Sequence, residues 1–426
     1  MVGDEHDLAR RLSATLEVAR ETLAAFGEDG FSDAHAPQNN FKPDKVVAET
    51  AMVVYAAAGA RRFPAIARQL DTLIGALAGA ARTDSMLLNM ALFPARSLDF
   101  AVAHILLGRL GAGDPAVCAF LDLCLEADAR NGHERPAFAR MERNWIMSVK
   151  RGARDASAWR ADLAACVLAA PLDLLGGLRE DAYAFTHLLM YVTDFGAAPS
   201  CAPRAADILL GEAEALLAAT LDSEDYDLAG EALLAWPFLN EPWNAAAAFG
   251  FGVLAEIEDV VGVLPNGLTD EKRLAALPAA DKKRYALGTA YHTAYVMGLL
   301  CAAALRPGRA PPSTLTGPAH DPAANAALLS RIDTRRGHWA RAYHARDAAD
   351  RARLTPLLRD IALVQAYRRH DYGAMSDILA IAAQYRLPDS ALTRQGCELL
   401  ARLAQCAPLL GRAGASRSGA AAHALA

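Results

Sequence analysis

Residues 183–190 read Tyr-Ala-Phe-Thr-His-Leu-Leu-Met, a run that is apolar apart from two hydroxyl groups and the imidazole of His187. Three other runs have a similar composition, with Glu49 inside residues 46–54, His104 inside 100–107 and His292 inside 290–295. A helix that is apolar on nearly every side must contact neighbours all round. The four runs are therefore expected to form a buried inner layer of helices.

The rest of the chain also favours helices. Alanine, leucine, arginine and glutamate dominate the sequence, and all four are good helix formers. Runs of β-branched and aromatic residues with alternating polarity, which are typical of strands, are almost absent. The sequence therefore predicts an all-α protein, with helical periodicity over most of the chain, including the segment 323–352.

More amphipathic helices lie between the four apolar runs. This alternation, over about residues 40–305, resembles the paired-helix rings of α/α-toroid proteins, although no motif of a specific family accompanies it. The resemblance implies an α/α toroid or superhelix of paired helices. We expect this helical ring to occupy residues 1–305.

A proline-rich connection is expected over residues 306–322, because proline interrupts helices. This stretch contains Pro307, Pro311, Pro312, Pro318 and Pro322. Residues 323–411 are expected to form a C-terminal helical bundle. Small residues dominate 412–426, which we expect to be a disordered tail.

The charge of the chain excludes several classes of partner. Among 426 residues, 43 basic and 49 acidic side chains give a net charge of −6, which attracts neither nucleic acid nor an anionic membrane. No apolar stretch approaches the roughly 20 residues that span a bilayer. The acidic segment 1–7 lacks the basic and apolar regions of a secretory signal. We therefore expect a cytoplasmic protein whose seven cysteines are free thiols.

The strongest candidate site is a polar stripe on one helix. Tyr183, His187, Tyr191 and Asp194 are spaced by four, four and three residues, which places them on one helix face. At the centre of a helical ring, His187 would act as a general base or metal ligand, with Asp194 or a tyrosine orienting it. The alternative is a core histidine that is satisfied by a single hydrogen bond.

His292 is the second candidate for catalysis, since it is another histidine embedded in an apolar helix. Tyr295 follows on the same helix face. The alternative is an aromatic core stripe without a functional role. The residues expected to line the pocket are Tyr191, Glu49, His104, Tyr295, Trp243, Asn244 and Glu256.

The last three of these residues lie in and after a stiff loop. Trp243 and Asn244 belong to a segment rich in tryptophan and proline, an element that typically rims a pocket. Glu256 and Asp259 then follow at i, i+3 on a helix and form a candidate pair of carboxylates. The alternative is that these acids lie on a solvated helix face.

No HExxH, Walker or GxSxG motif fixes a reaction class, and the sequence specifies no cofactor, no metal and no oligomeric state. Two function hypotheses remain. An enzyme would use His187 and His292 for acid–base or metal-assisted chemistry on a small organic molecule, and its embedded polar residues would face one cavity. A noncatalytic scaffold would bind a peptide or protein in its concave face, with those residues isolated and individually satisfied.

Overall fold

The computed structural model describes residues 3–25, 43–267, 269–335 and 337–413, and within this part of the chain it contains helices but no strand. The predicted all-α class is therefore confirmed. The helices up to residue 305 are α1 (Glu5–Ala25), α2 (Pro43–Ala57), α3 (Pro64–Ala80), α4 (Asp84–Leu92), α5 (Ser97–Arg109), α6 (Pro115–Ala129), α7 (Ala137–Arg151), α8 (Arg160–Ala164), α9 (Arg179–Thr193), α10 (Ala206–Asp222), α11 (Tyr226–Leu233), α12 (Ala235–Leu239), α13 (Ala245–Val261), α14 (Glu271–Ala276) and α15 (Ala279–Ala304). The later helices are α16 (Pro322–Leu329), α17 (His338–His344), α18 (Ala348–Arg353), α19 (Thr355–Arg368), α20 (Tyr372–Gln384) and α21 (Ala391–Ala413).

Local sequence signals explain where several helices begin and end. Asp114 caps α6 by accepting hydrogen bonds from the backbone N–H groups of Ala116 and Val117, and Pro115 occupies the first helical position. The periodic segment 323–352 is not one helix but three short ones, because the chain turns between α16 and α17. Gly337, which precedes α17, has a φ of 115° that other residues rarely adopt.

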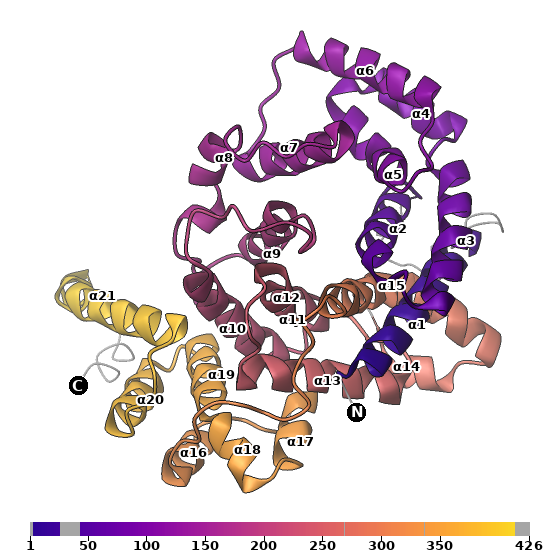
Figure 1. The fold of residues 1–426 in the computed structure, drawn as a ribbon. Helices are drawn as coiled ribbons and strands as arrows, with labels where there is room; N and C mark the ends of the chain where they lie inside the picture. The colour runs from indigo at the N-terminus through magenta and orange to yellow at the C-terminus, as the bar shows by residue number, and fades with distance from the viewer. Residues whose placement is uncertain (1–2, 26–42, 268, 336, 414–426) are drawn as a thin grey trace.

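Six helices contact one another in a closed circuit. The contacts run from α2 to α5, then to α7, α9, α11 and α15, and from α15 back to α2. Figure 1 shows these helices around the middle of the molecule, with α1, α3, α4, α6, α8 and α10 on the outside. Each of those outer helices packs on at least one member of the circuit.

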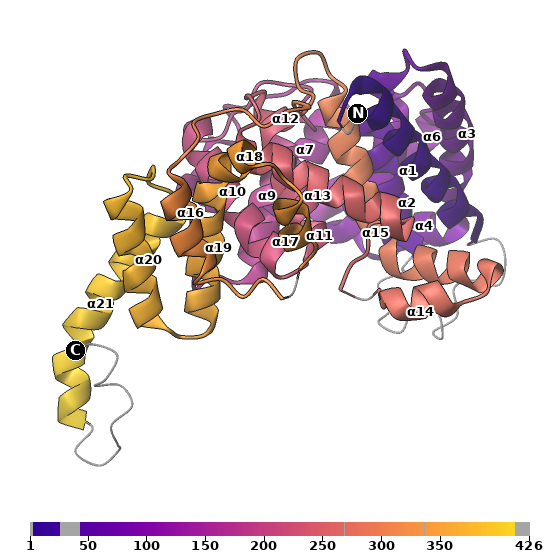
Figure 2. The ribbon, with the colours of Figure 1, turned by 90° about the horizontal axis from the view of Figure 1, so that it is seen from below.

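The C-terminal helices pack against the outside of this assembly. Helix α19 lies on α10, α17 lies on α13, and α20 and α21 continue outward from α19. Figure 2 shows α20 and α21 at one edge of the molecule, opposite α3. Helix α21 reaches Ala413, so residues 414–426 of the expected tail lie outside the described residues.

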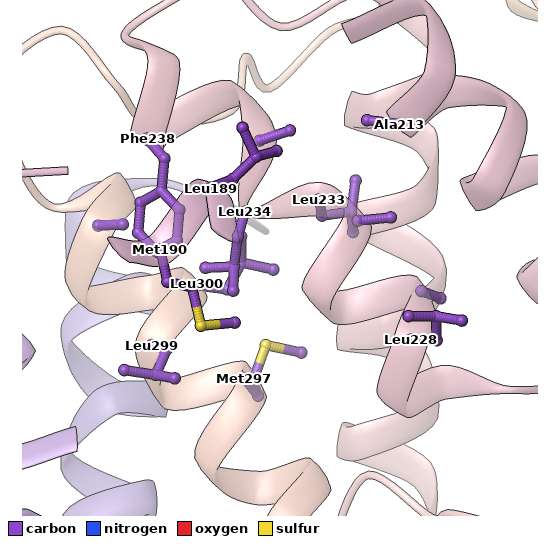
Figure 3. Close-up of a cluster of buried hydrophobic side chains, with 14 of the residues drawn as sticks. Leu189, Met190, Ala213, Leu228, Leu233, Leu234, Phe238, Met297, Leu299 and Leu300 are labelled. Carbon is purple, nitrogen blue, oxygen red and sulfur yellow. The ribbon is translucent and has the colours of Figure 1, made fainter. Parts of the chain in front are cut away.

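The core is formed where the circuit helices meet. Its buried side chains are mostly leucine, alanine and valine, and together they remove a large apolar area from water. Figure 3 shows a part of this core between α9, α11, α12 and α15, with Leu189, Met190, Leu233, Phe238, Met297 and Leu300 lying together.

No single helix in the described ranges is long and apolar enough to cross a membrane. Asp84–Leu92 and Pro94–Arg109 together reach the required length and composition, but the chain bends by 118° between them.

The close contact between α1 and α15 yields a stability prediction. A Cβ atom added at Gly298 would lie 2.3 Å from Cγ2 of Thr15, whose hydroxyl donates to the carbonyl oxygen of Ala294 at 3.0 Å. Gly298→Ala should therefore lower the free energy of unfolding by about 1–3 kcal/mol, measured by urea denaturation.

Gly75→Ala is the matched control, because Gly75 lies inside α3 with nothing within 4 Å of an added Cβ. This control should be more stable than the parent by about 0.5–1 kcal/mol, as alanine is the better helix former. If Gly298→Ala unfolded at the same urea concentration as the parent, this would show that α1 does not pack so closely on α15.

Candidate functional site

A cavity of about 770 Å³ lies between α2, α9, α11 and α15. Among the described residues, every one that lines the cavity is charged, polar, aromatic or glycine. The titratable groups Glu49, Tyr183, His187, Asp227 and His292 come from all four helices. Such a wall suits a small polar molecule better than an apolar one.

One acid–histidine pair joins α9 to α11. Nε2 of His187 lies 3.2 Å from Oε1 of Glu231, and the two side chains form both a hydrogen bond and an ion pair. The other carboxylate oxygen of Glu231 accepts a hydrogen bond from the hydroxyl of Thr186 at 2.5 Å. Glu231 is almost fully buried, so its charge depends on these two partners.

A second histidine lies between two carboxylates. Nδ1 of His292 is 3.2 Å from Oε2 of Glu49, and Nε2 is 3.5 Å from Oδ1 of Asp227. The second oxygen of Asp227 accepts a hydrogen bond of 2.6 Å from the hydroxyl of Tyr183. The imidazole of His292 therefore links α2, α11 and α15 through charge.

Three atoms of this cluster are buried without a well-formed hydrogen bond. Among the described residues, Oε2 of Glu49, Oδ1 of Asp227 and Nδ1 of His292 have no hydrogen-bond partner of acceptable geometry. Buried polar atoms normally have such partners, and each exception calls for an explanation. Here the three atoms converge on one place at the cavity wall.

The surroundings shift the pKa values of both histidines. Burial alone would lower the pKa of His292, but Glu49 and Asp227 outweigh it and raise the pKa to about 10. Burial likewise opposes the charge of His187, and Glu231 raises its pKa above the ordinary value.

The pKa values of the carboxylates shift in different directions. Burial raises the pKa of Asp227, and the neighbouring Glu231 adds to this. For Glu49 and Glu231 the opposing charges of His292 and His187 overcome burial, and both pKa values fall below the ordinary range. Buried groups whose pKa values are pushed apart in one cavity are typical of functional sites.

The position of the carboxylates along their helices helps to explain how they are tolerated. Glu49 and Asp227 lie in the N-terminal halves of α2 and α11, whereas His187 lies just past the middle of α9, before core residues such as Leu189. The positive end of a helix dipole stabilises a nearby carboxylate. Asp227, in the first turn of α11, benefits most from this effect.

The predicted polar stripe on α9 divides in two. Tyr183 and His187 line the cavity, and their rings contact each other at 5.9 Å between centroids. Tyr191 is buried one turn further along and donates a hydrogen bond of 2.8 Å to Oε1 of Glu142. Asp194 follows the helix end with a φ of 50° and is not part of the cavity wall.

Tyr191 is connected to a second cavity through its partner. Glu142 lines a neighbouring cavity of about 560 Å³, and Lys45 lines both cavities. Burial raises the pKa of Glu142. The two cavities therefore meet at the start of α2.

His104 and Tyr295, also expected in the pocket, lie in the core. The ring of His104 is buried, accepts a hydrogen bond of 3.2 Å from Nε of Arg82 and lies 3.2 Å from Sγ of Cys118. The hydroxyl of Tyr295 lies 2.8 Å from that of Thr50. Both are individually satisfied, as the scaffold hypothesis expects of isolated polar residues.

The loop before α13 is also away from the cavity. Trp243 is buried and donates to the backbone oxygen of Arg309 at 2.8 Å. Asn244 caps α13 and donates to Glu214 at 2.7 Å; burial, together with Asp360, raises the pKa of Glu214 to about 7.

Glu256 is exposed on α13 and does not line the cavity. Its neighbours on that helix pair instead with α1, since the buried guanidinium of Arg11 binds Glu258 and Asp259. The structure therefore separates Glu256 from Glu49, His187 and His292, which share the cavity.

Sequence reasoning missed the two carboxylates of α11. Asp227 and Glu231 are spaced by four residues, so they lie on one helix face. The signal was present, because both acids stand in the otherwise apolar run 226–233. Together with His292 they offer three ligand atoms within 4.8 Å of one another, a group of a kind that holds metal ions.

Comparisons with known proteins add a family but no activity. A family model described as "Domain of unknown function (DUF6895)" matches residues 12–302. No curated protein and no solved structure matches. The matched region contains the whole cavity and its acid–histidine cluster.

The environment of Asp194 predicts a structural role for this residue. Its carboxylate accepts hydrogen bonds from Tyr55 of α2 at 3.1 Å and from Nε1 of Trp145 of α7 at 2.9 Å. Asp194→Ala removes these acceptors and places alanine in a left-handed conformation. The free energy of unfolding should fall by about 2–4 kcal/mol in chemical denaturation.

Asp194→Asn tests the same point with a milder change. Asparagine keeps one acceptor oxygen and tolerates the left-handed conformation, so this variant should lose less than half as much stability. Equal stability of the alanine variant and the parent would show that the hydrogen bonds from Tyr55 and Trp145 do not hold these helices together.

Proposed function

We propose that this chain, which belongs to the DUF6895 family, is an enzyme that acts on a small polar organic molecule in the cavity between α2, α9, α11 and α15. The observation that carries the proposal is the convergence of His187, His292, Glu49 and Asp227 at one polar cavity, with the buried Glu231 paired to His187. A scaffold gains nothing from burying so many titratable groups together, because each costs desolvation free energy.

The chemistry is acid–base or metal-assisted. His187 and His292 line the cavity with ring nitrogens 3.2–3.5 Å from carboxylate oxygens, which is the arrangement that orients an imidazole for proton transfer. The hydroxyl of Tyr183 donates a hydrogen bond to Asp227 and that of Thr186 donates one to Glu231, so both carboxylates have fixed orientations. Preorganised groups of this kind act on a reacting molecule without first having to rearrange.

The architecture belongs to the same proposal. The closed circuit of α2, α5, α7, α9, α11 and α15 supports an α/α toroid, with these helices as its inner layer and the flanking helices as its outer layer. A ring of this kind places the cavity among inner helices, where water is limited and charges interact strongly. A cytoplasmic location is proposed on the free cysteines.

The test is consumption of a small molecule by the purified chain. The full-length protein is incubated, with and without added divalent metal ions, with a mixture of sugars, polyols, amino acids and hydroxy acids, and loss of each compound is followed by mass spectrometry. Glu231→Gln should slow the consumption by at least about 100-fold, because the partner of His187 is lost. Glu256→Gln, an exposed change outside the cavity, should leave the rate unchanged.

Two results would contradict the proposal. One is that the parent consumes no compound while it binds a peptide or protein, which the scaffold hypothesis predicts. The other is that Glu231→Gln, folded as judged by circular dichroism, retains the parent rate.

A further inference from the structure

The geometry points to a binding site for one divalent metal ion formed by Asp227, Glu231 and His292. This inference rests on the proposed function, which it makes more specific by assigning a cofactor to the same cavity. Each of the three residues offers a ligand atom, and these atoms lie within 4.8 Å of one another. A metal ion held at about 2.0–2.2 Å from its ligands keeps them roughly 3–4.4 Å apart, so only small side-chain rotations are needed.

The two carboxylates are oriented as metal ligands usually are. Oδ2 of Asp227 accepts a hydrogen bond from the hydroxyl of Tyr183, and Oδ1 faces His292. In Glu231 the hydroxyl of Thr186 occupies Oε2, and Oε1 faces the other way, toward His187. Oδ1 of Asp227 is therefore available to a cation, whereas Glu231 would have to exchange its contact with His187 for the metal. Hydrogen bonds from Tyr183 and Thr186 to the second oxygen of each acid are the kind that orients metal ligands.

His292 is oriented in the same manner. Its Nδ1 lies 3.2 Å from Glu49 and its Nε2 points toward Asp227. The charge of Glu49 beside Nδ1 favours a proton on that nitrogen, so Nε2 is the atom that would release its proton and bind a metal. Glu49 would therefore act as a positioning residue rather than as a ligand.

The buried atoms without hydrogen bonds are an independent observation. Asp227 is 8% exposed, and its Oδ1 has no hydrogen-bond partner among the described residues although it points at the centre of the cluster. A cation between Asp227, Glu231 and His292 would give this oxygen the partner that burial demands.

The ligand set indicates the class of ion. Two carboxylate oxygens and one imidazole nitrogen suit Mn²⁺ and Zn²⁺, whereas Ca²⁺ prefers oxygen ligands alone. Three protein ligands leave further coordination positions open toward the cavity, as in catalytic rather than structural sites.

The experiment measures binding of the metal alone. Full-length protein is stripped with a chelator, dialysed and titrated with MnCl₂ by calorimetry, with electron paramagnetic resonance counting the bound Mn²⁺; ZnCl₂ and CaCl₂ are parallel titrations. We expect one Mn²⁺ or Zn²⁺ per chain and weaker binding of Ca²⁺. Asp227→Asn should weaken the binding by at least about 100-fold and Glu49→Gln by about 10- to 100-fold.

The control is Glu256→Gln, which removes an exposed carboxylate of α13 and should leave the affinity unchanged. Circular dichroism melting of each variant separates lost binding from lost folding. The inference is overturned if neither Mn²⁺ nor Zn²⁺ binds the folded parent, or if binding persists in both Asp227→Asn and Glu231→Gln.

The outcomes also separate this inference from the proposed function. If the metal-stripped protein consumes a small molecule at a rate that added Mn²⁺ and Zn²⁺ do not change, the metal site is refuted, but the proposal that the protein is an enzyme stands. Tight, Asp227-dependent binding of Mn²⁺ or Zn²⁺ by a protein that consumes none of the compounds would support the metal site and refute the proposal that the protein is an enzyme.

Discussion

The cavity depends on one constraint, which is that each of the carboxylates Glu49, Asp227 and Glu231 faces a histidine from another helix. Glu231 faces His187 across α11 and α9, while Glu49 and Asp227 face His292 from α2 and α11. In an apolar core an unpaired charge would cost several kcal/mol. The same pairs therefore connect four helices of the contact circuit and define the polar end of the core.

This constraint divides α9 along its length. In α9 the residues from Leu188 onward pack into the core, while Tyr183 and His187, nearer its start, face the cavity. Helix α11 is buried along its whole length, and its two acids, Asp227 and Glu231, lie one turn apart on one face. The side chain of Val296 on α15 packs directly against Gly230 of α11, which has no side chain to keep the two helices apart.

Much of this arrangement could be predicted from the sequence. Helix formers without strand patterns predicted the all-α class, and single polar residues in apolar runs identified Glu49, His187 and His292, which share the cavity. Asp227 was missed because an acid in the first turn of a helix is also an ordinary start signal. Glu256 was misplaced because which side of α13 faces inward is decided by tertiary packing, with Arg11 of α1 pairing Glu258 and Asp259.

A double-mutant cycle on Glu231 and His187 measures whether the imidazoles and carboxylates form one coupled site. Unfolding free energies are measured for the parent, Glu231→Gln, His187→Gln and the double variant. If the two groups are coupled, the double variant loses less stability than the sum of the two single losses, with a coupling free energy of about 1.5–3 kcal/mol. Losses that add within about 0.5 kcal/mol would mean that the two groups do not interact, and would contradict a coupled site.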